Sequence, residues 1–234
     1  MKKSTIKKLA TLFLVAFAVV VSASTLLAAD AFRFEKDVQR YEKLSQEEPP
    51  TSDTTFFVGS STFTGWKEIP NDFQSCKAIN RGFGGSQISD WLDVAADRIL
   101  TPYKPSRIVF FCGCNDIASG KTAESVVDDF KTFVQKMRDA NPDVVIHFCA
   151  LHMPPVREKH WNAFKTFNAA VKEIVDQDER IFYVDFALAT SDENGAGRPE
   201  LFKNDRLHLT RDAEKILVPL ILESIQKEKE TLAK

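Results

Sequence analysis

The sequence predicts a single α/β domain built on a parallel sheet, and three observations support this. Short apolar runs alternate with longer amphipathic segments after Pro50, as in folds whose strands are connected through helices. The runs are continuously apolar, which is typical of parallel strands buried on both faces. The chain has 234 residues, 44% of them hydrophobic, which suffices for one core and is too little for two.

Five apolar runs have the length of buried strands. They cover residues 55–58, 77–80, 107–112, 144–150 and 181–186. The spacing of apolar residues predicts helices over 88–100, 123–140 and 161–176, because residues three and four positions apart share one helix face. A mixed-charge segment over 34–46 predicts a helix before the first strand, and a last helix starts at the capping residue Thr210 and runs to about residue 229.

The first 29 residues have the three parts of a secretory signal peptide. Four Lys precede an apolar run over 9–21, and small residues cluster over 22–29. Cleavage is expected between Ala23 and Ala31, which would leave residues 30–234 as a secreted or periplasmic domain. The alternative is an uncleaved membrane anchor, because the uncharged part of this segment is long enough to cross a bilayer.

Charge and cysteine content restrict the function. The chain has 31 Lys and Arg against 33 Asp and Glu, and four of the Lys lie in the predicted leader, so the mature chain would carry six more acidic than basic residues. This balance argues against nucleic acid as a partner. The four Cys do not have zinc-site spacing. Cys112 and Cys149 lie in apolar runs, which favours buried free thiols, with a disulfide involving Cys76 left open.

Candidate functional residues are expected in the loops after the strands, because these loops meet at one edge of a parallel sheet. The turn Gly59-Ser60-Ser61-Thr62 follows the first strand and makes Ser61 a candidate nucleophile. Taken alone, such a turn is more often a helix cap. The glycine-rich segment 80–86 follows the second strand, where backbone N–H groups can approach a ligand closely, although a tight turn before a helix is the simpler interpretation.

Two further loops carry polar side chains of catalytic type. Asn115, in Gly113-Cys114-Asn115-Asp116 after the third strand, could donate a hydrogen bond to an oxyanion, although Asx turns and helix caps are the commoner use of such residues. Asp205 and His208 share a loop after the fifth strand. There the carboxylate can accept the Nδ1 proton and leave Nε2 to deprotonate a serine, while a surface salt bridge is the alternative. Together the loops supply every group that acyl transfer needs.

These segments resemble the four sequence blocks of the SGNH hydrolases, also called the GDSL esterase and lipase family. The resemblance rests on Gly59-Ser60-Ser61, Gly85, Gly113-Cys114-Asn115-Asp116 and Asp205-Arg206-Leu207-His208, and it spans essentially the whole mature chain. It implies a flavodoxin-like three-layer α/β/α sandwich with five parallel strands in the order 2-1-3-4-5. The family usually has an acid where this chain has Ser60, so the choice of Ser61 over Ser60 rests on block alignment; the Gly-Ser-Ser form is similar to one branch of the family.

Carried over by position, the resemblance implies a role for each residue of these blocks. Ser61 would be the nucleophile, His208 the base and Asp205 the residue that orients it. The N–H groups of Ser61 and Gly85 and the Asn115 amide would form the oxyanion hole, with the preceding glycine as an alternative to Gly85. No metal or organic cofactor is implied.

Four residues near these blocks are candidates for contact with a substrate, namely Ser60, Phe63, Trp66 and His152. Phe63 and Trp66 could form an apolar acyl pocket, although aromatic residues after a first strand more often pack a helix against the sheet. His152 follows the fourth strand but has no acid at a suitable spacing, so it ranks behind His208 as a base.

The sequence therefore predicts an exported serine esterase that hydrolyses a carboxylic ester through an acyl-enzyme. The expected partner is a small-molecule ester, either an acylated carbohydrate, another small ester or a lysolipid. Membrane contact is expected only if the leader stays uncleaved, and a monomer is the default. Two alternatives stay open: a catalytically silent glycan- or lipid-binding module on the same fold, and a lysophospholipase or thioesterase.

Overall fold

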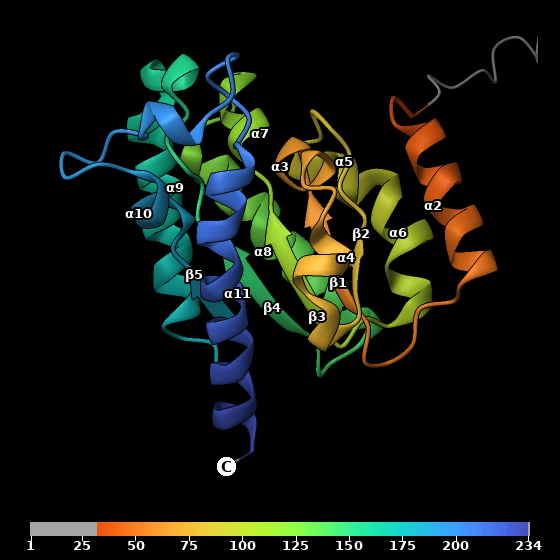
Figure 1. Cartoon of the computed structure of the whole chain (residues 1–234). Helices are drawn as coiled ribbons and strands as arrows, with labels where there is room; N and C mark the ends of the chain where they lie inside the picture. Colours follow the sequence, from red (N-terminus) through yellow and green to blue (C-terminus); the bar gives the residue numbers. More distant parts are fainter. Residues whose placement is uncertain (1–31, 234) are drawn as a thin grey trace, which may run out of the picture. The chain divides into compact units, whose positions relative to one another are not determined.

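The computed structural model of the chain describes residues 32–233, so the predicted leader lies outside the described residues. The unit that begins at Lys36 is compact. Its centre is a parallel sheet of five strands in the order β2-β1-β3-β4-β5, with helices on both faces (Figure 1). The predicted fold class and strand order are confirmed.

The five strands coincide with the five apolar runs. They are β1 (Thr55–Gly59), β2 (Ala78–Asn80), β3 (Arg107–Phe111), β4 (Val145–Cys149) and β5 (Ile181–Val184). The last predicted strand was two residues too long, because Asp185 ends it by accepting a hydrogen bond from Leu188 N at 2.9 Å and so capping the next helix. Apolar residues continue past that point, which is why hydropathy alone could not find the boundary.

Ten α-helical segments lie in the described residues. They are α2 (Glu35–Glu47), α3 (Ser61–Gly65), α4 (Ile69–Asp72), α5 (Ile88–Asp90), α6 (Ala96–Ile99), α7 (Cys114–Ala118), α8 (Ala123–Ala140), α9 (Trp161–Val175), α10 (Phe186–Thr190) and α11 (Arg211–Leu232). The predicted helix over 88–100 is divided by a π-helical turn, Trp91–Ala95, where Trp91 stacks on Phe83 with 4.4 Å between the ring centroids. The short helices α3, α4, α7 and α10 were not predicted, because they contain too few residues to show a period.

Alternate residues of the central strands point to opposite helix layers. Phe110 of β3 stacks on Phe133 of α8, with 4.5 Å between ring centroids, whereas its neighbour Phe111 contacts Phe63 of α3 at 6.1 Å. Accordingly α8 lies behind the sheet in Figure 1 and α11 in front of it. Both faces of the sheet are covered, which explains why the strands are continuously apolar.

A buried polar network joins α11 to the sheet. Arg107 of β3 donates two hydrogen bonds to the Glu228 carboxylate, at 2.6 and 2.7 Å. His147 of β4 lies between Glu228, 2.9 Å from its Nε2, and the Ser224 hydroxyl, 2.7 Å from its Nδ1. Burial lowers the pKa of His147, so the ring is neutral near pH 7, and Arg107 is the cation that balances the carboxylate.

The four cysteines are free thiols and all are buried, as expected from their apolar surroundings. Burial raises the pKa of Cys112 and Cys149 well above the ordinary value for a thiol, so neither is a thiolate at neutral pH. In the part of the chain that the structure describes, no helix is both long and apolar enough to span a membrane.

Candidate active site

Ser61 lies where β1 ends and α3 begins. Gly59, with φ +150°, brings the end of β1 so close to β3 that a Cβ there would lie 1.9 Å from the Phe111 carbonyl oxygen. Ser60 N donates to the same oxygen at 3.1 Å, which fixes the turn against β3. As a result Ser60 is only 3% exposed, whereas Ser61 is partly exposed. Of the two hydroxyls, that of Ser61 is the more accessible.

The glycine loop after β2 lies beside this turn. Asn80 connects the two, because its Oδ1 accepts a backbone N–H of the loop at 2.9 Å and its amide group donates to the Phe63 carbonyl. A Cβ built on Gly84 would lie 3.9 Å from Cβ of Ser61, and Gly85 has φ +82° with open space around it. The structure thus brings the loop to Ser61 through Gly84, and the choice of Gly85 as the oxyanion donor stays a prediction.

Asn115 lies in α7, directly after β3. Its Nδ2 donates to the Ser86 carbonyl at 3.0 Å, and its Oδ1 accepts from Arg157 Nη2 at 2.7 Å. A side-chain amide has two N–H groups, and within residues 32–233 the second has no acceptor. This amide can therefore donate one hydrogen bond to a ligand.

Asp116 supports the same corner of the sheet. It is fully buried, and both of its oxygens accept from Ile88 N, at 3.1 and 3.2 Å. Burial raises the pKa of Asp116, while a hydrogen bond from Lys121 Nζ at 3.0 Å opposes the rise. Asp116 of α7 thus accepts hydrogen bonds from the first residue of α5. This carboxylate therefore holds α7 against the start of α5.

Asp205 and His208 form a pair on the loop before α11. Asp205 Oδ2 lies 2.7 Å from His208 Nδ1, and Oδ1 accepts from Leu207 N and His208 N at 2.9 and 3.0 Å. These bonds, that from the imidazole first, hold the pKa of Asp205 well below its usual value. An ionised carboxylate can only accept, so Nδ1 carries the proton that faces Asp205, and Nε2 is the ring nitrogen that can act as a base.

Three of the predicted loops meet at one small cavity of about 10 Å³. Ser61 and Asn115 line it, and Leu207 brings the loop of the Asp205–His208 pair to its wall. The other lining residues are Ser60, Thr62, Phe111, Cys114, His152, Pro154 and Arg157. The cavity has room for about one water molecule.

His152 lines this cavity but is buried, and its contact with a substrate stays a prediction. Its ring stacks on Phe111 with 5.1 Å between centroids, and its Nε2 lies 3.4 Å from Thr62 Oγ1. Burial, helped by the charges of Arg157 and His208, lowers the pKa of His152 to about 3. Within the described residues its Nδ1 has no hydrogen-bond partner. His152 is thus a neutral polar group beside the cavity, and it has no carboxylate to orient it as a base.

Phe63 and Trp66 do not form an acyl pocket, which corrects that sequence-based expectation. Both side chains have no exposed surface. Phe63 packs against Phe57 of β1 at 5.3 Å, and Trp66 contacts Phe73 at 5.7 Å between ring centroids. Because Phe73 also contacts Phe57, at 4.8 Å between ring centroids, these aromatic side chains pack the segment after Ser61 against β1.

Arg157, in the segment Pro155–His160 after β4, is a further residue of this site that was not predicted from the sequence. It lies in a loop at the same edge of the sheet as the other candidates, and that rule alone could have identified it. No motif marks it, because an Arg within a Pro-rich, highly charged segment has many possible uses. Only the fold brings it to Asn115, which precedes it by 42 residues.

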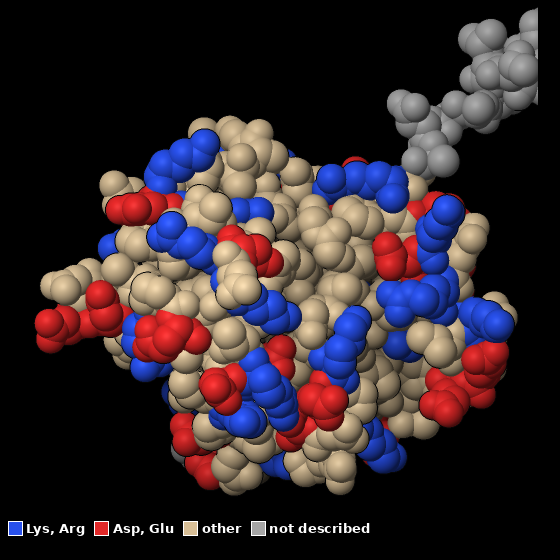
Figure 2. All heavy atoms as spheres, turned by 45° about the horizontal axis from the view of Figure 1, so that its top comes forward, with Lys and Arg blue, Asp and Glu red and all other residues tan. Residues whose placement is uncertain are grey.

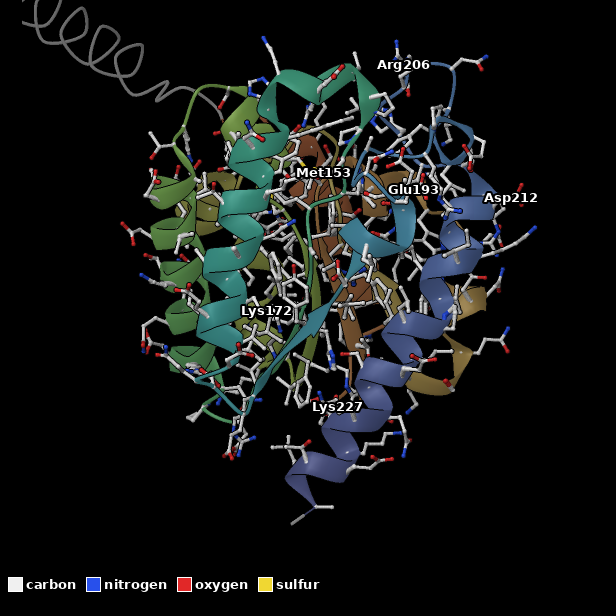
Figure 3. The ribbon with its side chains drawn as sticks, turned by 90° about the vertical axis from the view of Figure 1, so that its left-hand side faces the viewer. Met153, Lys172, Glu193, Arg206, Asp212 and Lys227 are labelled. Atoms are coloured by element: carbon white, nitrogen blue, oxygen red, sulfur yellow. The ribbon has the colours of Figure 1, made fainter. Side chains whose placement is uncertain are left out.

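Larger hollows lie away from this cavity. One of about 480 Å³ runs beside β5 between α9 and α11, flanked by Lys172 and Lys227, and contains none of the predicted site residues (Figure 3). Among the described residues, no three His, Cys, Asp or Glu side chains cluster in a way that could hold a metal ion. On the face shown in Figure 2, Lys and Arg side chains are interspersed with Asp and Glu and do not form a continuous basic surface.

Comparison with known proteins finds a matching family. The model of the GDSL-like lipase/acylhydrolase family matches residues 53–216. No curated protein matches the chain. Among solved structures, a GDSL-like lipase from Bacteroides thetaiotaomicron superposes with a TM-score of 0.69 at 20% identity, covering 81% of this chain and 97% of its own.

Two esterases share the fold at lower similarity. A carbohydrate esterase of family 3 from Talaromyces cellulolyticus has a TM-score of 0.60 at 16% identity, with 76% of this chain and 98% of that chain covered. A psychrotrophic esterase from Pseudoalteromonas sp. has a TM-score of 0.59 at 18% identity, with 75% and 97% covered. At such identities the likeness shows the fold alone.

Proposed function

The chain belongs to the GDSL-like lipase/acylhydrolase family of carboxylic ester hydrolases, and from this premise we propose that it cleaves its ester through an acyl-enzyme on Ser61. The observation that carries the proposal is the shared cavity. Ser61 and Asn115 line it, and Leu207 brings the Asp205–His208 loop to it. This arrangement supports the proposal that a nucleophile, an oxyanion donor and an oriented base act at one place.

In the proposed reaction, His208 Nε2 takes the proton of the Ser61 hydroxyl as Oγ attacks the ester carbonyl carbon. The developing oxyanion accepts hydrogen bonds from the free N–H of Asn115 and from backbone N–H groups at Ser61 and the glycine loop. The bond between the carbonyl carbon and the alcohol oxygen then breaks, and the alcohol leaves with the proton from His208. Water, deprotonated by the same imidazole, releases the carboxylic acid and restores Ser61.

The proposed substrate carries a short acyl group, such as an acetyl group on a carbohydrate. The cavity beside Ser61 measures about 10 Å³, which is room for about one water molecule and provides no preformed space for a long acyl chain. The two aromatic rings that could have widened it are in the core. The fold is shared with a carbohydrate esterase, which is consistent with a sugar as the alcohol.

Hydrolysis of p-nitrophenyl esters from acetyl to long acyl chains, by wild type and Ser61→Ala, tests the proposal. Wild type is expected to be fastest on acetate, and Ser61→Ala should lose activity by at least three orders of magnitude while keeping its thermal unfolding midpoint. Labelling by a fluorophosphonate should disappear in Ser61→Ala and persist in Ser60→Ala. Retained hydrolysis in Ser61→Ala would overturn the nucleophile assignment, and a preference for long chains would overturn the short acyl group.

Export is part of the proposal and is supported by the pattern of the first 29 residues, with four Lys, an apolar run and small residues. We expect the protein recovered from outside the cytoplasm to begin between Ala23 and Ala31. Determination of its N-terminal residue checks this. An N-terminus at Met1 in membrane-bound protein would indicate an anchor instead.

A further inference from the structure

Arg157 reaches the proposed oxyanion hole from a different loop. It lies in the 3-10 segment Pro155–His160 after β4, at a kink where its own φ and ψ, −109° and 22°, are not helical. From there its Nη2 donates to Asn115 Oδ1 at 2.7 Å. Both residues line the cavity of Ser61. The kinked segment is itself held to the proposed base loop, because Val156 N donates to the Arg206 carbonyl at 3.2 Å.

The contacts of Asn115 allow only one orientation of its amide group. Oδ1 faces the guanidinium of Arg157, a donor, and Nδ2 faces the Ser86 carbonyl, an acceptor, 3.0 Å away. If the amide turned over, two donors would face each other at one end and two acceptors at the other. The remaining N–H is therefore held in one direction. Without Arg157, only the single bond to Ser86 would oppose rotation.

The guanidinium has no competing acidic partner. Arg157 is half-buried, and no carboxylate in residues 32–233 lies within ion-pair distance of it. A guanidinium is always charged and is a directional donor. Here it donates to Asn115 Oδ1 at 2.7 Å, and the Cys114 thiol is another side-chain neighbour.

We propose that Arg157 is a positioning residue, which fixes the Asn115 amide so that its free N–H is already aimed at the oxyanion before the reaction starts. This inference rests on the proposed function above, because it requires Asn115 to be an oxyanion donor. Donors that need no reorganisation at the moment of reaction give most of the stabilisation in such sites. Arg157 should therefore affect the chemical step rather than substrate binding.

The test is a double-mutant cycle on p-nitrophenyl acetate, with kcat and KM measured separately. Asn115→Ala should lower kcat by roughly two to three orders of magnitude, and Arg157→Met by roughly 10- to 100-fold with KM nearly unchanged. In the Asn115→Ala background, Arg157→Met should cause no further loss beyond about twofold, because its target is gone. Arg157→Lys should recover part of the rate.

Lys159→Met is the matched control, because it removes one exposed positive charge from the same segment and should keep wild-type kcat. Independent, multiplicative losses from Asn115→Ala and Arg157→Met, or an effect on KM alone, would overturn the inference. If Ser61→Ala is inactive and Arg157→Met has wild-type kcat, only this inference fails. Retained activity in Ser61→Ala would overturn the proposed function and this inference with it.

Discussion

At the scale of single residues, the turn that carries Ser61 depends on the missing side chain of Gly59. Its φ is +150°, and a Cβ would lie 1.9 Å from the Phe111 carbonyl oxygen of β3, where no atom can be accommodated unless the strands separate. Gly59→Ala is therefore expected to destabilise the fold by about 3 kcal/mol or more. Urea unfolding of the two proteins measures this difference.

Gly65→Ala is the matched control for that substitution. Gly65 ends α3 only six residues later, and a Cβ there would meet nothing within 4 Å. The unfolding free energy of the Gly65→Ala variant should stay within about 0.5 kcal/mol of wild type. Equal unfolding midpoints for Gly59→Ala and Gly65→Ala would contradict the close approach of β1 to β3.

Contacts between candidate residues could be predicted from sequence where the residues lie close together along the chain. Asp205 and His208 are near neighbours along the chain, so their pairing at 2.7 Å needed only a local turn. The position of Arg157 in a loop after β4 could have marked it as a candidate, but its contact with Asn115 could not be predicted, because that contact depends on how two distant loops pack. For Phe63 and Trp66 the prediction was wrong. Their closeness to Ser61 in sequence suggested an acyl pocket, but both side chains are buried in the core.

At the scale of secondary structure, the length of each helix determined whether it could be predicted from the sequence. The helix predicted over 123–140 was found with the same ends, Ala123–Ala140, because 18 residues give a clear apolar face and Thr122 caps it through Ser125 N at 3.2 Å. The helices α3 and α7 have five residues each and leave no periodic trace. These two helices hold Ser61 and Asn115, so the local geometry of the site was beyond the reach of pattern analysis.

The strand order is also not a property of any single element. Continuous apolar runs indicated parallel strands, but they do not show which strands are neighbours in the sheet. The order 2-1-3-4-5 was predicted from the resemblance of four sequence blocks to a known family. The observed order places β1 between β2 and β3. This explains why the loops after these three strands meet at Ser61, and why the blocks carry information about topology.

At the scale of the whole molecule, the buried network under α11 links global stability to pH. Burial alone would raise the pKa of Glu228, but hydrogen bonds from His147 and Arg107 lower it to about 2, against 4.5 ordinarily. A carboxyl whose pKa falls on folding stabilises the native state above pH 4.5, and this contribution is lost as the pH falls towards 2. The pKa of His147 is also lowered on folding. Below about pH 6.5 the unfolded chain therefore binds a proton that the native protein does not, so both groups destabilise the native state in acid.

Glu228→Gln should therefore remove the part of the acid sensitivity that belongs to this carboxylate. The substitution leaves the Arg107 guanidinium without its charge partner, so we expect a loss of about 3 kcal/mol in unfolding free energy at pH 7. The difference from wild type should narrow as the pH falls from 4.5 to 2, because the wild-type carboxyl is then also neutralised. Urea unfolding at a series of pH values measures it, with the exposed Glu223→Gln on the same helix as a control expected to follow wild type throughout. A constant difference across that pH range would show that the network is held by packing, and that the charge on Glu228 contributes nothing to stability.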